Sequence, residues 1–99
     1  MITRHWTGRV KPEEAQNYIN YLQKEILPHL RNLDGFTGAG INRRSLENGI
    51  EFLFVSNWAS LEHIRAFAGE NIEVAVVAEK AQKMMLDFDK EVRHYEVLE

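Results

Sequence analysis

The sequence predicts an α+β fold in which helical segments alternate with four strands in the order βαββαβ. Three observations support this prediction. Runs with strand propensity lie near both ends of the chain, an Asn-Gly pair separates two extended runs in the middle, and apolar residues recur at helical spacing on either side of that hairpin. A chain of 99 residues has room for one core, so we expect a single domain over residues 1–99.

The first strand is predicted over residues 2–10, where threonine and tryptophan favour pleated structure. A helix begins at Pro12, because proline suits the first helical turn, and two glutamates follow it. Pro28 is expected to end or kink this helix near Ile26. The apolar stripe of the helix consists of residues three and four apart, namely Ala15, Tyr18, Ile19, Leu22 and Ile26.

The Asn48-Gly49 pair predicts a hairpin with strands over residues 36–46 and 50–58. A two-residue type I′ turn requires positive φ at both central residues, and it would pair Ile41 with Ser56. Glycines at positions 38 and 40 leave the first of these strands without side chains at two positions, which permits a bulge.

The second helix is predicted to follow Ser60, a good N-cap, and to stop at Gly69. Residues 71–77 are expected to be irregular or extended, and a short third helix should then run to about Phe88. The last strand is predicted over residues 91–98. This order is that of a ferredoxin-like sandwich with a four-stranded antiparallel sheet.

The composition excludes several classes of function. Charged residues make up 27% of the chain and the formal net charge is −3, which argues against nucleic acid and anionic membranes as partners. The absence of cysteine excludes disulfides and thiolate metal sites, and no two of the four histidines are four residues apart, so we expect no metal site. With no apolar stretch of about 20 residues and no signal-peptide pattern, we expect a cytoplasmic protein.

The third predicted strand contains a continuous apolar run, Phe-Leu-Phe-Val, at residues 52–55. Successive side chains of a strand point to opposite faces, so both faces of the sheet require burial there. Helices of the predicted lengths can cover only one face. We therefore expect a second copy of the chain against the other face, in a homodimer. The alternative is that one or two of these residues are exposed at an edge.

Five segments carry a resemblance to a known family: WTGRV (residues 6–10), GFTG (35–38), FVSNWASLEHIRAFAG (54–69), AVV (75–77) and HYEV (94–97). The most telling element is Trp58 at the end of a strand, followed nine residues later by the aromatic Phe67. In these segments the chain resembles the antibiotic biosynthesis monooxygenase family, whose fold is the dimeric α+β barrel.

The resemblance implies a pocket in each subunit, between the sheet and its own helices. Cofactor-free members deprotonate a phenol or anthrone, and its anion reacts with O₂, which requires an apolar cavity, a polar group for the anion and a base. Haem-degrading members use an Asn on the first strand and a His after the second helix. Here Asn57 lies on the third strand, and residues 71–73 are Asn-Ile-Glu, so we expect no cofactor and haem is disfavoured.

Several candidate site residues have a functional and a structural interpretation. In the functional interpretation Trp58 lines the pocket and donates its indole N–H to a ligand; in the structural one it anchors the second helix to the sheet. Asn57 binds the ligand, or it starts the turn into the helix. His63 is a base or a flanking surface histidine. His94 is a base, paired with Glu96 in a way that would raise the imidazole pKa, or it contacts the other subunit.

Arg4 and Trp6 share one face of the first strand, at the expected centre of the sheet. A central arginine needs an anion, which is either a ligand carboxylate or phenolate, or else Glu51 or Glu96. Tyr95 either donates its hydroxyl to a substrate carbonyl or packs in the core.

The apolar run favours a small homodimer, and the family resemblance implies that it binds a small apolar or aromatic molecule and acts as a cofactor-independent monooxygenase on an aromatic or polyketide-like substrate. Two alternatives remain open: a non-catalytic ligand-binding or stress-associated dimer, and a haem-binding oxygenase. The candidate bases are His63 and His94, and the candidate substrate-binding residues are Arg4, Trp6, Asn57, Trp58, Phe67 and Tyr95.

Overall fold

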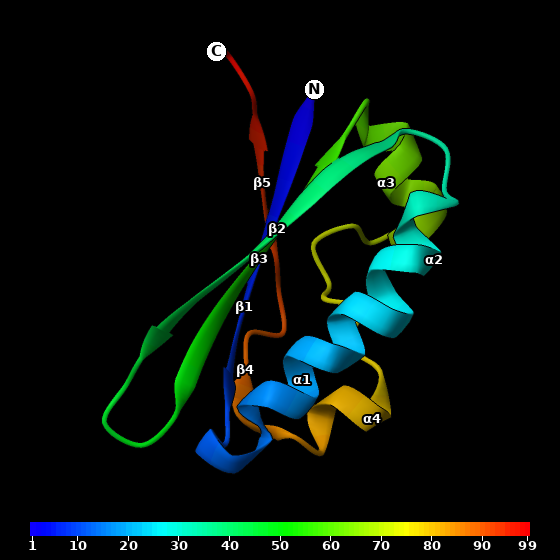
Figure 1. Ribbon diagram of the computed structural model, residues 1–99. Coiled ribbons are helices and arrows are strands. Elements are labelled where there is room, and N and C mark those ends of the chain that lie inside the picture. The colour runs from blue at the N-terminus through cyan, green and yellow to red at the C-terminus, as the bar shows by residue number, and fades with distance from the viewer.

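An antiparallel sheet with its helices on one face makes up the protein, as seen in a computed structural model that describes residues 1–99 (Figure 1). The strands are β1 (Ile2–Val10), β2 (Phe36–Ser45), β3 (Ile50–Trp58), β4 (Met85–Phe88) and β5 (Arg93–Glu96). The helical segments are η1 (Pro12–Glu14), α1 (Ala15–Tyr21), η2 (Leu22–Ile26), α2 (Leu27–Arg31), α3 (Leu61–Ala68) and α4 (Glu79–Gln82). The predicted α+β, ferredoxin-like class is confirmed.

The sheet has five strands rather than the predicted four. Its order is β2-β3-β1-β4, and β5 pairs with the same edge of β1 as β4 does. β4 lies beside the second half of β1, and β5 lies beside its first half. Two short strands therefore share the position predicted for one, and they satisfy the backbone groups along β1.

The predicted third helix extends too far. Helix α4 ends at Gln82, and residues 85–88 form β4 instead of further helical turns. In β4, Met85 pairs with Val10, and Met85 is buried in the core. The local helix propensity of this segment is overridden by the unpaired edge of β1, which only an extended segment can complete.

The first helical segment runs from Pro12 to Arg31 without a break, so Pro28 does not end it. A proline has no N–H and its ring clashes with the carbonyl four residues earlier. The chain accommodates Pro28 by widening to a π-helix in η2, where the Leu27 amide donates to the Leu22 carbonyl five residues before it.

The hairpin of β2 and β3 has a longer loop than predicted. Ile41 pairs with Phe54 rather than with Ser56, a shift of two residues, and residues 46–49 form the loop. No non-glycine residue has a positive φ, so Asn48 does not enter a type I′ turn. Because the shift is even, the side chains from Gly38 to Ser45 stay on their predicted faces of the sheet. The permitted bulge is present, between Phe36 and Gly38.

The ends of α3 are those predicted. Ser60 caps the helix by accepting a hydrogen bond from the His63 amide (3.4 Å), and Gly69 follows with a φ of 92°. Residues 69–78 have no helix or strand, as expected. An isolated bridge pairs Val74 with Glu91, and backbone hydrogen bonds join Ala75 to Lys90 (2.9 Å) and Glu73 to Val92 (2.7 Å).

Two clusters of buried side chains join the helices to the sheet. In the first, Tyr18 and Leu22 pack on Val10 and Phe52. In the second, which is centred on Trp58, α2 and α3 meet the end of β3. None of the helices is long and apolar enough to span a membrane.

The other face of the sheet carries no helix (Figure 1). The apolar run of β3 therefore divides between the two faces, with Phe52 and Phe54 packed under the helices and Leu53 and Val55 on the open face. Leu53 and Val55 are only half-buried in the single chain.

Replacing Gly35 with alanine is expected to lower the free energy of unfolding by about 3 kcal/mol. Gly35 has a φ of 82°, and a Cβ there would lie 2.2 Å from the Cγ of His63 on α3. Gly69→Ala is the matched control, since its φ is also positive but nothing lies within 4 Å of the new Cβ; about 1 kcal/mol is expected for it. Urea unfolding measures both losses, and equal losses would contradict this packing.

Candidate ligand-binding site

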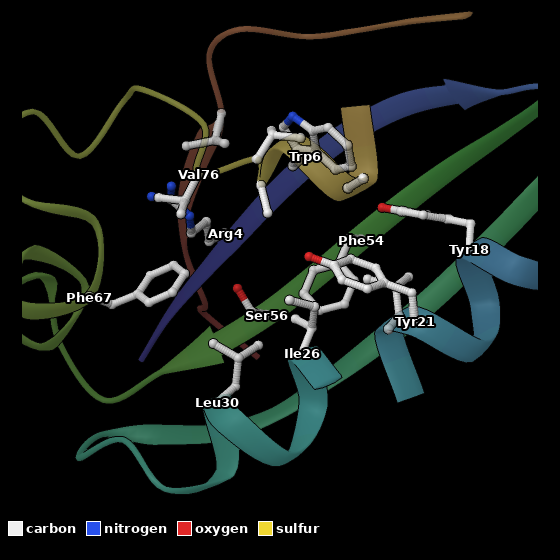
Figure 2. Close-up of a pocket in the computed structure, with 15 residues that line it drawn as sticks. Arg4, Trp6, Tyr18, Tyr21, Ile26, Leu30, Phe54, Ser56, Phe67 and Val76 are labelled. Carbon is white, nitrogen blue, oxygen red and sulfur yellow. The ribbon is translucent and has the colours of Figure 1, made fainter. Parts of the chain in front are cut away.

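A cavity of about 90 Å³ lies between the sheet and the helices (Figure 2). Of its 15 lining residues, 13 are hydrophobic. Strands β1 and β3 form its floor, helices α1 and α2 form one wall, and α3 together with residues 76–78 forms the other. Its polar groups come from Arg4, Ser56 and two tyrosines, Tyr18 and Tyr21.

Arg4 provides the only ionised side chain of the cavity. Alternation along β1 points it under the helices, where it is 5% exposed. Its Nη1 donates to the carbonyl of Ile72 (2.7 Å) and to Nε2 of His94 (2.9 Å), and its Nη2 donates to the carbonyl of Val74 (3.2 Å). The guanidinium also lies 5.7 Å from the centre of the Phe67 ring.

The expected ion pair of Arg4 with Glu51 or Glu96 is not formed. Glu51 projects from the opposite face of the sheet, where it binds Arg9 and Arg44. Burial lowers the pKa of Arg4 to about 10, so the group is still protonated at neutral pH. The cavity therefore contains a positive charge that no carboxylate of the chain balances.

His94 on β5 is the neighbour of Arg4 and does not line the cavity. Since its Nε2 accepts the Arg4 hydrogen bond, the imidazole is neutral, with its proton on Nδ1. Burial lowers the His94 pKa, the charge of Arg4 lowers it further, and Glu73 opposes both. The prediction that Glu96 raises this pKa is wrong, because the nearest charged group is a cation.

Trp58 lies beneath the cavity rather than in its lining. It is completely buried, and its Nε1–H donates to the hydroxyl of Ser56 (2.9 Å), so the indole N–H is already used. Its ring stacks on Phe67 with centroids 5.4 Å apart. Trp58 thus anchors α3 to the sheet and supports two residues that do line the cavity.

The other sequence-predicted residues are divided between the cavity and the surface. Trp6 and Phe67 line the cavity with Arg4. Asn57 lies on the open face of the sheet. Tyr95 lies on the same face, and the centre of its ring is 4.9 Å from the centre of the His5 ring.

His63 also lies outside the cavity. Its Nδ1 is 2.8 Å from the Ser60 hydroxyl at the start of α3, and its ring fills the space beside Gly35.

Tyr18 and Tyr21 are functional candidates that the sequence analysis assigned only to packing or left aside. They are 2% and 8% exposed, and burial raises the pKa of both phenols, so both stay protonated at neutral pH. The signal that could have found them is a pair of tyrosines at helix positions where aliphatic residues would pack equally well, because a buried phenol normally has a polar partner.

The lining residues do not fit a haem. No histidine, cysteine or methionine lines the cavity, and Nε2 of the nearby His94 is occupied by Arg4. Nor does the chain contain a group of three or more acidic or histidine side chains that could hold a metal ion.

The free energy of unfolding is expected to fall as the pH drops from about 7.5 to about 5.5. The folded His94 has a pKa below its usual 6.5, so in this range the unfolded chain takes up the proton first, and the stability contributed by neutral His94 is lost. His94→Gln keeps an acceptor for Arg4 but does not titrate, and it should flatten this dependence. Urea unfolding at both pH values measures it, with His29→Gln, at an exposed histidine, as the control. Parallel losses in wild type and His94→Gln would contradict the assignment.

Solved structures share this fold at low sequence identity. One, from Bacillus cereus and assigned as an antibiotic biosynthesis monooxygenase, has a TM-score of 0.65 and 15% identity, over 99% of this chain and 91% of that chain. A conserved protein from Methanosarcina mazei Go1 has a TM-score of 0.63 and 21% identity, over 95% of this chain and 89% of that one.

A third structure is a monooxygenase from the gene ActVA-Orf6 of Streptomyces coelicolor in complex with the ligand Nanaomycin D. Its TM-score is 0.60 at 14% identity, over 95% of this chain and 82% of that chain. No curated protein matches the chain. The family model for antibiotic biosynthesis monooxygenase matches residues 1–71, which is well over half of the sequence. The chain therefore belongs to the antibiotic biosynthesis monooxygenase family.

Proposed function

We propose that the protein is a cofactor-independent monooxygenase that binds a small aromatic molecule as its anion, with the negative charge held at Arg4. One observation carries this proposal. Arg4 is 5% exposed, it borders an apolar cavity, and its guanidinium has no carboxylate partner. Burial of an unpaired charge costs several kcal/mol, so a ligand that brings the opposite charge is strongly favoured.

The donors of Arg4 support this role. A guanidinium has five N–H groups, and the protein accepts from three of them. The Nε–H and one N–H of Nη2 have no acceptor in the chain. Two N–H groups on neighbouring nitrogens suit an anionic oxygen or a carboxylate, and they do so more strongly in an apolar cavity than in water.

The chemistry needs little from the protein beyond binding. The substrate loses a proton, and its anion gives electrons to O₂. One oxygen atom is then bonded to the substrate carbon, and the other leaves as water with two hydrogens from the substrate. Arg4 lowers the energy of the anion, while the apolar walls exclude water from the reacting carbon.

Of the two candidate bases, His94 has the better support. It is neutral, and it lies behind Arg4, in contact with the guanidinium, without lining the cavity. When the guanidinium turns toward the forming anion, Nε2 of His94 becomes free to accept the proton that the substrate loses. His63 has no such contact, and its Nδ1 is beside Ser60.

The substrate must widen the cavity as it binds. Its volume of about 90 Å³ is smaller than the ~150 Å³ cavity that holds benzene in another protein. Residues 76–78 line the cavity from a segment, residues 69–78, that has no helix or strand, and Arg4 holds this segment through the carbonyls of Ile72 and Val74. A ligand that engages Arg4 therefore loosens the wall that has to move.

The proposal includes a homodimer whose open sheet faces pack together. Leu53 and Val55 on that face, with Tyr95 at its edge, would be buried by a second copy. The Streptomyces coelicolor monooxygenase structure is bound to the ligand Nanaomycin D, which supports a small-molecule ligand for this fold.

A second candidate function is a ligand-binding protein without catalysis. It is favoured by one observation, that no histidine or carboxylate side chain lines the cavity. Both candidates require the anion at Arg4, and only the enzyme requires O₂.

Product formation from a panel of quinols and anthrones is expected to require O₂. In Arg4→Gln the rate of product formation should fall about 100-fold, because removing one hydrogen bond to a developing anion typically lowers the rate by this factor. Arg31→Gln is the control at an exposed arginine on α2, and it should be unchanged. Circular dichroism and thermal unfolding check the fold of each variant, and Arg4→Lys tests whether charge alone restores part of the activity. Equal product in protein-free samples, or product formed without O₂, would refute the enzyme.

Analytical ultracentrifugation at micromolar concentration is expected to find a dimer. Val55→Asp should dissociate it, because the carboxylate would be buried against a second sheet. Leu61→Asp, at a residue that is 41% exposed on helix α3 and so away from the open face of the sheet, is the control and should leave the dimer intact. A wild-type monomer at this concentration would contradict the proposed interface.

A further inference from the structure

Two buried phenols face the cavity without a partner in the chain. Tyr18 and Tyr21 project from α1, and their hydroxyls point away from the helix and into the cavity (Figure 2). Both residues are more than nine-tenths buried. No hydrogen bond joins either hydroxyl to another protein group, and no fully buried polar side-chain atom lacks a partner, so both hydroxyls border accessible space.

Packing explains the rings but not the hydroxyls. The ring of Tyr18 meets Phe52 edge-to-face at 5.0 Å, and the ring of Tyr21 lies 6.3 Å from that of Tyr18. Phenylalanine would make the same contacts without placing a polar atom against an apolar cavity, which costs free energy unless the atom finds a partner. Burial raises the pKa of both phenols, so each is a hydrogen-bond donor at neutral pH.

The two hydroxyls and Arg4 lie on opposite sides of the cavity. Figure 2 shows Arg4 on β1 and the tyrosines on α1, with Phe54 on the floor of the cavity near the tyrosines. A ligand that spans the cavity therefore meets a cation at one end and neutral donors at the other.

We propose that Tyr18 and Tyr21 bind a second, uncharged oxygen of the ligand, so that the substrate class is an aromatic anion with a carbonyl or hydroxyl group at the end of the ring system away from its ionised group. This inference rests on the proposed function, since Arg4 must hold the anionic end. It adds the two tyrosines as residues that determine specificity.

The test compares two single-ring probes, benzoate and 4-hydroxybenzoate, which differ only in the oxygen opposite the carboxylate. Isothermal titration calorimetry is expected to find 4-hydroxybenzoate bound about 10-fold more tightly by the wild type. In the Tyr18→Phe/Tyr21→Phe variant this preference should fall below about 3-fold, with the affinity for benzoate unchanged. Tyr95→Phe, which removes a hydroxyl from the open face, is the matched control and should keep the full preference.

The outcomes distinguish a failure of the tyrosine assignment from a failure of the proposed function, in which Arg4 binds the anion. If both probes bind, Arg4→Gln weakens both and the double phenylalanine variant keeps the 10-fold preference, the tyrosine assignment is overturned and the anion site stands. If the wild type binds neither probe, or if Arg4→Gln binds both as tightly as the wild type, the anion site and the inference fail together. Thermal unfolding confirms that each variant is folded, and both phenylalanines preserve the ring packing.

Discussion

A positive charge buried between the sheet and the helices is the constraint on which the rest of the structure depends. Arg4 is the third residue of β1. Its guanidinium contacts the carbonyls of Ile72 and Val74, the imidazole of His94 and the ring of Phe67. These contacts connect β1 with β5 and with the region from α3 to Val74, which are distant from β1 in sequence. They supply dipoles and a π face but no negative charge, so a ligand that brings one would balance the buried cation.

The cavity around this charge is suited to binding and orienting a molecule rather than to attacking it. Its walls are apolar, its floor holds the Ser56 hydroxyl that Trp58 fixes in place, and its far side carries the hydroxyls of Tyr18 and Tyr21. Under the proposed function, such a site would stabilise an anion and exclude water, as a substrate that reacts directly with O₂ requires. The substrate would then provide the electrons, and a chain of 99 residues would need no cofactor for this chemistry.

Features set by local patterns could be predicted from the sequence. Alternation along β1 placed Arg4 and Trp6 on one face, and Ser60 and Gly69 marked the ends of α3. Features that depend on distant contacts could not be predicted in this way. The partner of His94 proved to be Arg4 rather than Glu96, because cross-strand pairing brings them together. Tyr18 was predicted only as part of an apolar stripe, since spacing does not show that its hydroxyl borders a cavity.

The most direct measurement of the central claim is the ¹⁵N NMR signal of the Arg4 guanidinium during a titration with benzoate. The signal is assigned by its loss in Arg4→Gln. The account predicts a saturable shift of the Arg4 Nε–H resonance, larger than that of any other arginine, as the free donor takes up the carboxylate. An Arg4 resonance that stays unchanged while benzoate binds, or while exposed arginines such as Arg31 respond instead, would contradict it.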